Sequence, residues 1–243
     1  MAKLQGWVAA ILLVACIWTP TVIAQTRNVD VGGRQIAIPV EKGYTLVSDD
    51  KAAMDLITSF LPPAMEVLAF SMHQEDVASD LLVNEQYPYY FYATIDKLRS
   101  IDMDETSWKT VRPMAETQLR ELDIGAASRD MMEQGNAKLT EFVGDKVEVS
   151  AKLADKQQVW TARDGSLRMT AVMPGRMEIA GKSANFVQDA GMAMLPVRER
   201  LLVINVYRKR DPQDQGSDAI RALLDAATRS MLKVNPPIGP SAN

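Results

Sequence analysis

Alternating apolar and polar residues mark the first regular structure expected in this chain. Two such segments, 28–31 and 34–38, flank Gly32-Gly33. Two adjacent glycines supply the positive φ angles of a tight hairpin turn. The pattern therefore predicts a β-hairpin, and a further extended segment is expected at 43–47.

Further strands are predicted where β-branched, aromatic and other apolar residues gather in short runs. Asp164-Gly165 and the charged turn 198–200 each predict a hairpin. The run 201–207 is apolar on both faces, which is typical of a central strand. A short helix or turn is expected over 74–82. The predicted strands are 66–72, 89–95, 157–162, 167–173, 177–179, 191–196 and 201–207.

Apolar residues spaced by three and four positions predict helices. Ser48-Asp49-Asp50 is expected to cap a first helix, which Pro62-Pro63 ends. A last helix is expected from about Ser217 to Asn235.

A long central helical region is expected to begin at Asp102 or Asp104. Pro113 lies inside it and either kinks the helix or marks its first turn. Gly125 suggests a break, followed by a second helix to Gly144. The buried stripe of the first part is Trp108, Val111, Ala115, Leu119 and Leu122.

These elements predict an α+β fold, a largely antiparallel sheet packed with several helices. It includes the long central helical region and the C-terminal helix. We expect residues 25–243 to form a single globular domain, with its core over about 28–235 and a loose tail after it.

The first 24 residues have the pattern of a signal peptide. Lys3 supplies a positive start, the apolar run 7–17 is too short to span a bilayer, and Pro20 breaks it. Ala24 precedes the expected cleavage point. The remaining chain is therefore predicted to be periplasmic or secreted, with no transmembrane segment.

A lipoprotein signal is the alternative for the leader. Leu13-Val14-Ala15-Cys16 resembles a lipobox, in which Cys16 is lipidated and becomes the first residue. The apolar residues Ile17-Trp18 then stand where lipoproteins usually turn small and polar, which favours cleavage after Ala24.

The amino-acid composition argues against several kinds of catalytic and binding site. Cys16 is the only cysteine, so the chain after the leader is disulfide-free and has no thiolate nucleophile. The net charge of −4 gives no general attraction for nucleic acid. His73 is the only histidine. Glu75 and Asp76 lie near it, but the common zinc and triad patterns are absent, which favours an ordinary histidine at a strand end.

Three patterns superficially resemble catalytic or binding sites. Residues 102–106 match the D-x-D-x-T string of haloacid-dehalogenase-type phosphotransferases. No apolar strand precedes them, and Asp102 with Glu105 is better explained by helix capping. The basic run 208–210 is explained by a solvated strand end, and the aromatic run 87–92 by a strand that is core on one side.

Methionine is frequent, with 14 residues in the chain. Thioethers are ligands for Cu(I), and a copper carrier would need several sulfurs converging at the surface. Methionine is also a common core filler. The recurrent positions are Met169, Met173, Met177, Met192 and Met194.

The chain resembles a group of uncharacterised exported proteins of proteobacteria. The likeness lies in Val31–Pro39 leading to Gly43-Tyr44, in the strand 201–207 and in the closing helix 220–235. A final hairpin followed by a C-terminal helix is also similar to the PsbP/Mog1 type of α/β/α sandwich. That resemblance implies a binding or assembly role.

We therefore expect a non-catalytic exported accessory protein that binds an envelope protein or a small ligand through a sheet face or edge. We assign no catalytic, cofactor-binding or metal-binding residue. The alternatives are a metal-dependent hydrolase and a methionine-based copper carrier. The hydrolase would use clustered carboxylates, Asp49, Asp50, Asp102 and Asp104.

Overall fold

The computed structural model describes most of the chain after the leader. The described residues are 25–47, 51–62, 64–78, 87–121, 124–151, 157–211, 213 and 216–236. The predicted signal peptide, the predicted helix cap at 48–50 and the C-terminal tail lie outside these residues.

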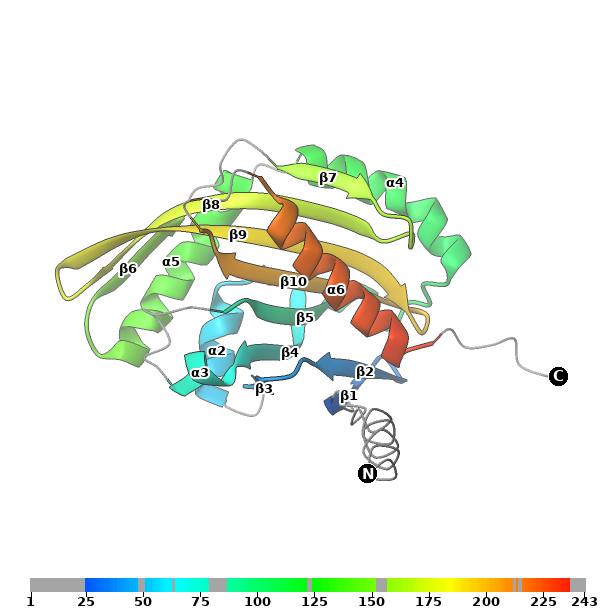
Figure 1. Cartoon of the computed structure of the whole chain (residues 1–243), viewed down its shortest axis with the longest axis horizontal. Coiled ribbons are helices and arrows are strands. Elements are labelled where there is room, and N and C mark those ends of the chain that lie inside the picture. The colour runs from blue at the N-terminus through cyan, green and yellow to red at the C-terminus, as the bar shows by residue number, and fades with distance from the viewer. Residues whose placement is uncertain are drawn as a thin grey trace, which may run out of the picture.

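Strands and helices are mixed along the chain, as an α+β fold requires (Figure 1). The strands are β1 Gln25–Val31, β2 Arg34–Val40, β3 Tyr44–Leu46, β4 Met65–His73, β5 Tyr89–Ile95, β6 Val147–Ala151, β7 Gln158–Thr161, β8 Leu167–Ile179, β9 Lys182–Val197 and β10 Arg200–Lys209. The helices are α2 Lys51–Ser59, α3 Gln74–Ala78, η1 Asp96–Leu98, α4 Glu105–Glu121, α5 Ile124–Val143 and α6 Asp218–Val234.

Eight strands form one antiparallel sheet, in the order β3-β4-β5-β10-β9-β8-β6, with β7 also pairing with β8. The β1–β2 hairpin forms a separate two-stranded sheet. β10 pairs with β5 on one side and β9 on the other, which confirms the central position expected for 201–207.

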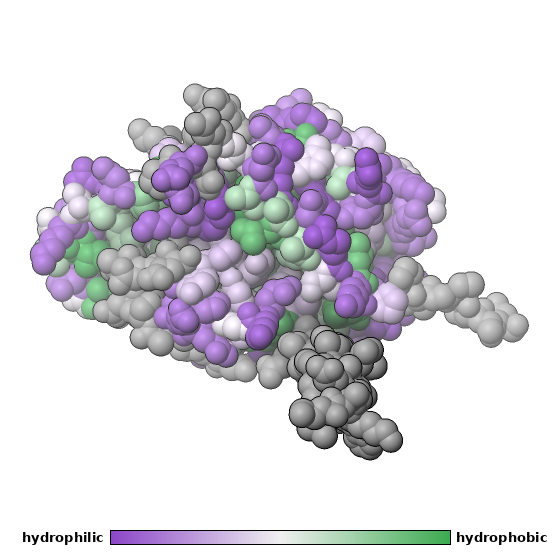
Figure 2. All heavy atoms as spheres, in the orientation of Figure 1, coloured by the Kyte–Doolittle hydropathy of each residue, from purple (hydrophilic) through white to green (hydrophobic). Residues whose placement is uncertain are grey.

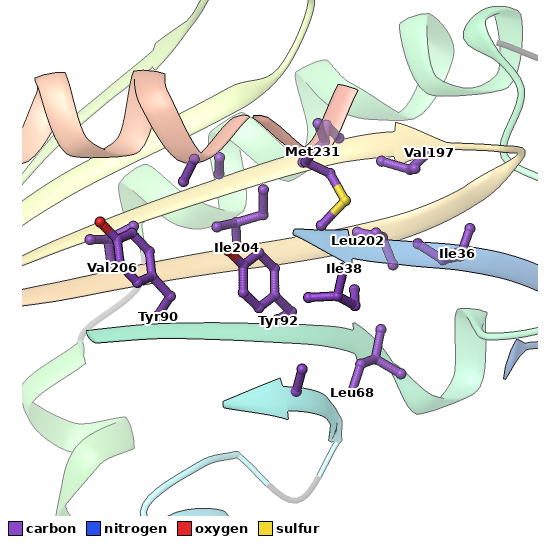
Figure 3. Packing of buried hydrophobic residues seen from close by; sticks show 14 of the residues in the cluster. Ile36, Ile38, Leu68, Tyr90, Tyr92, Val197, Leu202, Ile204, Val206 and Met231 are labelled. Atoms are coloured by element: carbon purple, nitrogen blue, oxygen red, sulfur yellow. The ribbon is translucent and has the colours of Figure 1, made fainter. Parts of the chain in front are cut away.

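One face of the large sheet is covered by α6 and the β1–β2 hairpin (Figure 1). The apolar side of α6 packs there because Ile220, Leu224 and Met231 recur at helical spacing and are fully buried. Figure 3 shows Met231 above Ile204 and Leu202 of β10. Each such side chain contributes about 1.5–3 kcal/mol when fully buried.

The opposite face carries two further apolar clusters. One lies under α4, around Trp108, Leu167 and Val203. The other lies under α2, around Phe70 and Phe91. The strand 89–95 therefore contributes to cores on both faces, which corrects the expectation that it would be core on one side.

The β8–β9 hairpin is longer than the sequence pattern indicated. β8 runs unbroken from Leu167 to Ile179, so the separate strand predicted at 177–179 is wrong. Pro174 pairs with Val187 of β9, whose carbonyl accepts from the N–H of Arg210 on the side of β9 that faces away from β8. Pro174 and Val187 therefore exchange no hydrogen bonds with each other, and the strand tolerates a residue without an N–H at this position. The position that lacks an N–H therefore faces the outer edge, between β6 and β7.

Two expectations about the central helices also need correction. Pro113 lies inside α4, which already begins at Glu105, so it does not mark a first turn. Gly125 lies in the first turn of α5 and is not the break. The division into two successive helices is confirmed. No helix of the described chain is long and apolar enough to cross a membrane.

Candidate functional site

Side chains from α5 close the outer edge of β6. Asn136 donates from Nδ2 to the carbonyl of Val149 at 2.9 Å and accepts from its N–H at 2.8 Å. One turn later, Thr140 Oγ1 bonds the carbonyl and N–H of Val147 at 3.2 and 3.1 Å. These groups imitate a neighbouring strand, so this edge is blocked for strand pairing.

The outer edge of β2 is closed in the same way. Asn235, at the end of α6, accepts from the N–H of Ala37 at 2.8 Å and donates to its carbonyl at 2.7 Å. On β7, the guanidinium of Arg120 donates to the carbonyl of Val159 at 2.6 Å. β3 contains three residues, and a short edge strand is itself a poor template for pairing.

The outer edge of β1 has one such contact, at Asp30, and the described residues leave the rest of this edge uncovered. Because Ala37 turns its polar groups toward Asn235, its partner Asn28 turns its own away from β2. Thr26, Asn28 and Asp30 therefore point their backbone N–H and C=O groups outward. Arg99 donates to the carbonyl of Asp30 at 2.9 Å, whereas the outward groups of Thr26 and Asn28 have no partner among the described residues.

The hairpin that carries this edge is fixed to the large sheet. The buried guanidinium of Arg200 donates from Nε to the carbonyl of Val31 at 3.0 Å and from Nη2 to that of Gly32 at 2.7 Å. Gly32 has a φ of 55°, and an added Cβ would lie 2.3 Å from the carbonyl oxygen of Arg99. Only glycine fits this turn, so the edge is held in a defined position.

The carboxylates proposed for a hydrolase have structural partners or lie outside the described residues. Asp102 accepts from Arg200, and this hydrogen bond lowers the pKa of its carboxyl group. Asp104 accepts from the N–H of Ser107 at 2.7 Å and so caps α4. Asp49 and Asp50 are not described. Among the described residues, no group of three or more His, Cys, Asp or Glu is placed to hold a metal.

His73 ends β4, as expected. Its ring stacks on Tyr87 with the centroids 3.7 Å apart, and its Nδ1 accepts weakly from the N–H of Glu75 at 3.4 Å. Tyr44 packs edge-on against it. These contacts describe a histidine held in an aromatic stack.

Three of the five recurrent methionines come together. Met169 of β8 lies directly opposite Met192 of β9, and Met194 follows on the same face. All three belong to the apolar cluster under α4, and the sulfur of Met169 accepts from Gln157 at 3.0 Å. Met194 is buried in this cluster and the other two are half-buried against it, whereas a copper carrier needs sulfurs converging at the surface. Met173 and Met177 lie farther along β8, half-buried.

The basic run 208–210 is not a solvated strand end. Arg208 and Arg210 bind the two carboxylate oxygens of the buried Asp189 at 2.7 and 2.6 Å. Only Lys209 is exposed. Burial also raises the pKa of Tyr207, one residue before this run, to about 12.

Comparison with known proteins gives fold similarity alone. No family model and no curated protein matches the chain. Its fold is similar to that of a point mutant of the protein Mog1, with 12% identity, a TM-score of 0.33, and coverage of 86% of this chain and 94% of that one. The Ran-binding protein Mog1p of Saccharomyces cerevisiae is 11% identical, with a TM-score of 0.32 and coverage of 87% of this chain and 94% of that one. The PsbP/Mog1 resemblance expected from the sequence is thus supported only as a weak likeness of fold.

Proposed function

We propose that this chain is an exported, non-catalytic accessory protein that binds a protein of the cell envelope by strand addition along β1. The observation that carries the proposal is the contrast between edges. Side chains of α4 and α5 and of Asn235 after α6 close β7, β6 and β2, whereas the outward backbone groups of Thr26 and Asn28 have no partner in the part of the chain that the structure describes. Proteins usually block long edges, so an unblocked one favours use as a docking site.

The side chains of β1 are compatible with a bound strand. Val29 and Val31 pack toward the core, while Thr26, Asn28 and Asp30 are exposed. A partner strand would take its affinity from main-chain hydrogen bonds to Thr26 and Asn28 and its selectivity from polar contacts with this exposed row. Because Arg200 already holds the hairpin, binding would require little ordering of β1.

Site-specific photocrosslinking in cells of the native host tests the proposal. A benzophenone amino acid in place of Thr26 should give one discrete adduct with an envelope protein. The same group in place of Ser150, exposed on the sealed β6, should give none. An adduct common to both positions, or no adduct at Thr26, would contradict strand addition at β1.

A proline in β1 separates docking from folding. Asn28→Pro removes an outward N–H that β2 does not use, so the free energy of unfolding should change by less than about 1 kcal/mol. The adduct formed from position 26 should disappear. Asn28→Ala is the matched control and should keep the adduct, because it retains the N–H. Persistence of the adduct with Asn28→Pro would overturn the proposed mode.

A further inference from the structure

Asn205 is a polar side chain in the middle of the large sheet. It lies on β10, the central strand, and only 8% of its surface is exposed. Its amide nitrogen is fully enclosed and has no hydrogen-bond acceptor within the described chain. Buried amides in native proteins almost always have a partner, so this exception requires an explanation.

The surroundings of Asn205 are apolar. The strand register places Met192 of β9 on one side and Phe91 of β5 on the other. Val203 and Tyr207 precede and follow it on the same face. Met192 belongs to the cluster under α4, whereas Phe91 and Tyr207 belong to the cluster under α2. Asn205 therefore lies on the boundary between two apolar clusters.

Some residues on the same face as Asn205 are only half-buried. Met169, Met192 and Tyr207 are half-buried, although they line central strands of the sheet. Ala190, opposite Tyr207, is half-buried as well and carries only a methyl group. Methionine side chains adapt readily to an apolar guest, so Met169 and Met192 can move aside without a change in strand pairing.

We propose that movement of the methionine side chains opens this face to an uncharged, apolar small molecule that carries a carbonyl oxygen, and that the enclosed Asn205 amide then donates to that oxygen. A charged group is disfavoured because none of the four neighbours of Asn205 on this face has a charge to offset its desolvation. The site uses β10, β9 and β5, and it is independent of the β1 edge.

The first test uses the stability of the ligand-free protein. Asn205→Leu keeps the branched shape and removes the unpaired amide, so the urea midpoint of unfolding should rise. Thr94→Val is the control, because Thr94 is also a buried polar residue, on β5, but donates to the carbonyl of Leu201 at 2.9 Å. Its midpoint should fall. A lower midpoint for Asn205→Leu would show that the amide is satisfied and would overturn the proposal.

The second test measures binding by the full chain. Prodan is an uncharged naphthyl ketone whose emission shifts to the blue in apolar surroundings. We expect the wild-type protein to bind it and Asn205→Leu to bind it about tenfold more weakly. Diphenylhexatriene, a hydrocarbon without an acceptor, is the control and should bind Asn205→Leu no more weakly than wild type.

Two outcomes of the binding test would overturn the site: no Prodan binding to the wild-type protein, or equal Prodan affinity for both proteins. Because Asn28→Pro leaves β10 untouched, failure of this site and failure of strand addition at β1 are separately visible.

Discussion

At the scale of single residues, the buried carboxylate of Asp189 has the clearest consequence for stability. Its side chain is 1% exposed, and its two oxygens bind Arg208 and Arg210, which are 16% and 17% exposed. Pairing offsets the desolvation of the carboxylate, but a buried ion pair is weak grounds for net stability. Removing the charge of Asp189 takes away the negative charge that the two largely buried guanidinium groups face, which is the costly change.

We therefore expect Asp189→Asn to lower the free energy of unfolding by about 3 kcal/mol, measured by urea denaturation. Glu178→Gln makes the same chemical change in an exposed pair with Arg176, whose side chains are 45% and 58% exposed. It should cost less than about 1 kcal/mol. Similar losses for both variants would contradict the role assigned to burial.

At the scale of elements, two helices stabilise strands through side-chain amides. Asn136 of α5 and Asn235 at the end of α6 each bond both the N–H and the C=O of one strand residue. An asparagine amide has the same donor and acceptor as a peptide group, so it can replace a strand at that point. The helices thus close the sheet edges as well as covering the faces.

Asn235→Ala should consequently detach β2 from α6. We expect the N–H of Ala37 to exchange with deuterium faster, while the N–H groups paired between β9 and β10 keep their protection. The free energy of unfolding should fall by about 1–3 kcal/mol. Asn235→Asp retains an acceptor for the N–H of Ala37 and should protect it better than alanine does. Unchanged exchange at Ala37 in the alanine variant would contradict the clamp.

The elements recovered from the sequence are those with a clean apolar period. The β1–β2 hairpin, β5, β10 and α6 follow their predicted ranges closely. β6 and the first half of β9 were not predicted. Lys182, Ser183 and Asn185 are exposed and polar, so no apolar alternation marks the start of β9. β6 does alternate apolar and polar residues, but it is only five residues long. Their strand conformation comes from pairing with β8.

The candidate sites were less predictable, for a physical reason. The open edge of β1 is defined by contrast with contacts that join residues far apart in sequence, such as Ala37 with Asn235. Asn205 stood within a run judged apolar on both faces, and its lack of a partner depends on the packing of three strands. No local sequence pattern predicts the open edge of β1 or the unpaired amide of Asn205.

At the scale of the whole molecule, the point at which the leader is cleaved can be measured directly. β1 begins at Gln25, the residue after the proposed cleavage point. We expect native protein from its own host to have an intact mass that starts at Gln25, and Cys16→Ala to leave this mass unchanged. A mass matching a lipidated Cys16 would contradict cleavage after Ala24.

The ties of the N-terminal hairpin to the end of the chain also bear on folding kinetics. The hydrogen bond of Val31 can form only after Arg200, 169 positions later, is in place. That of Ala37 likewise needs Asn235, 198 positions later. Contacts of such high sequence separation form slowly, because the closure entropy of a long loop comes first. In a chain that emerges from a membrane pore N-terminus first, β1 and β2 would not pack on the rest of the domain until β10 and α6 had also emerged. Its earliest residues would therefore be among the last to reach the native state.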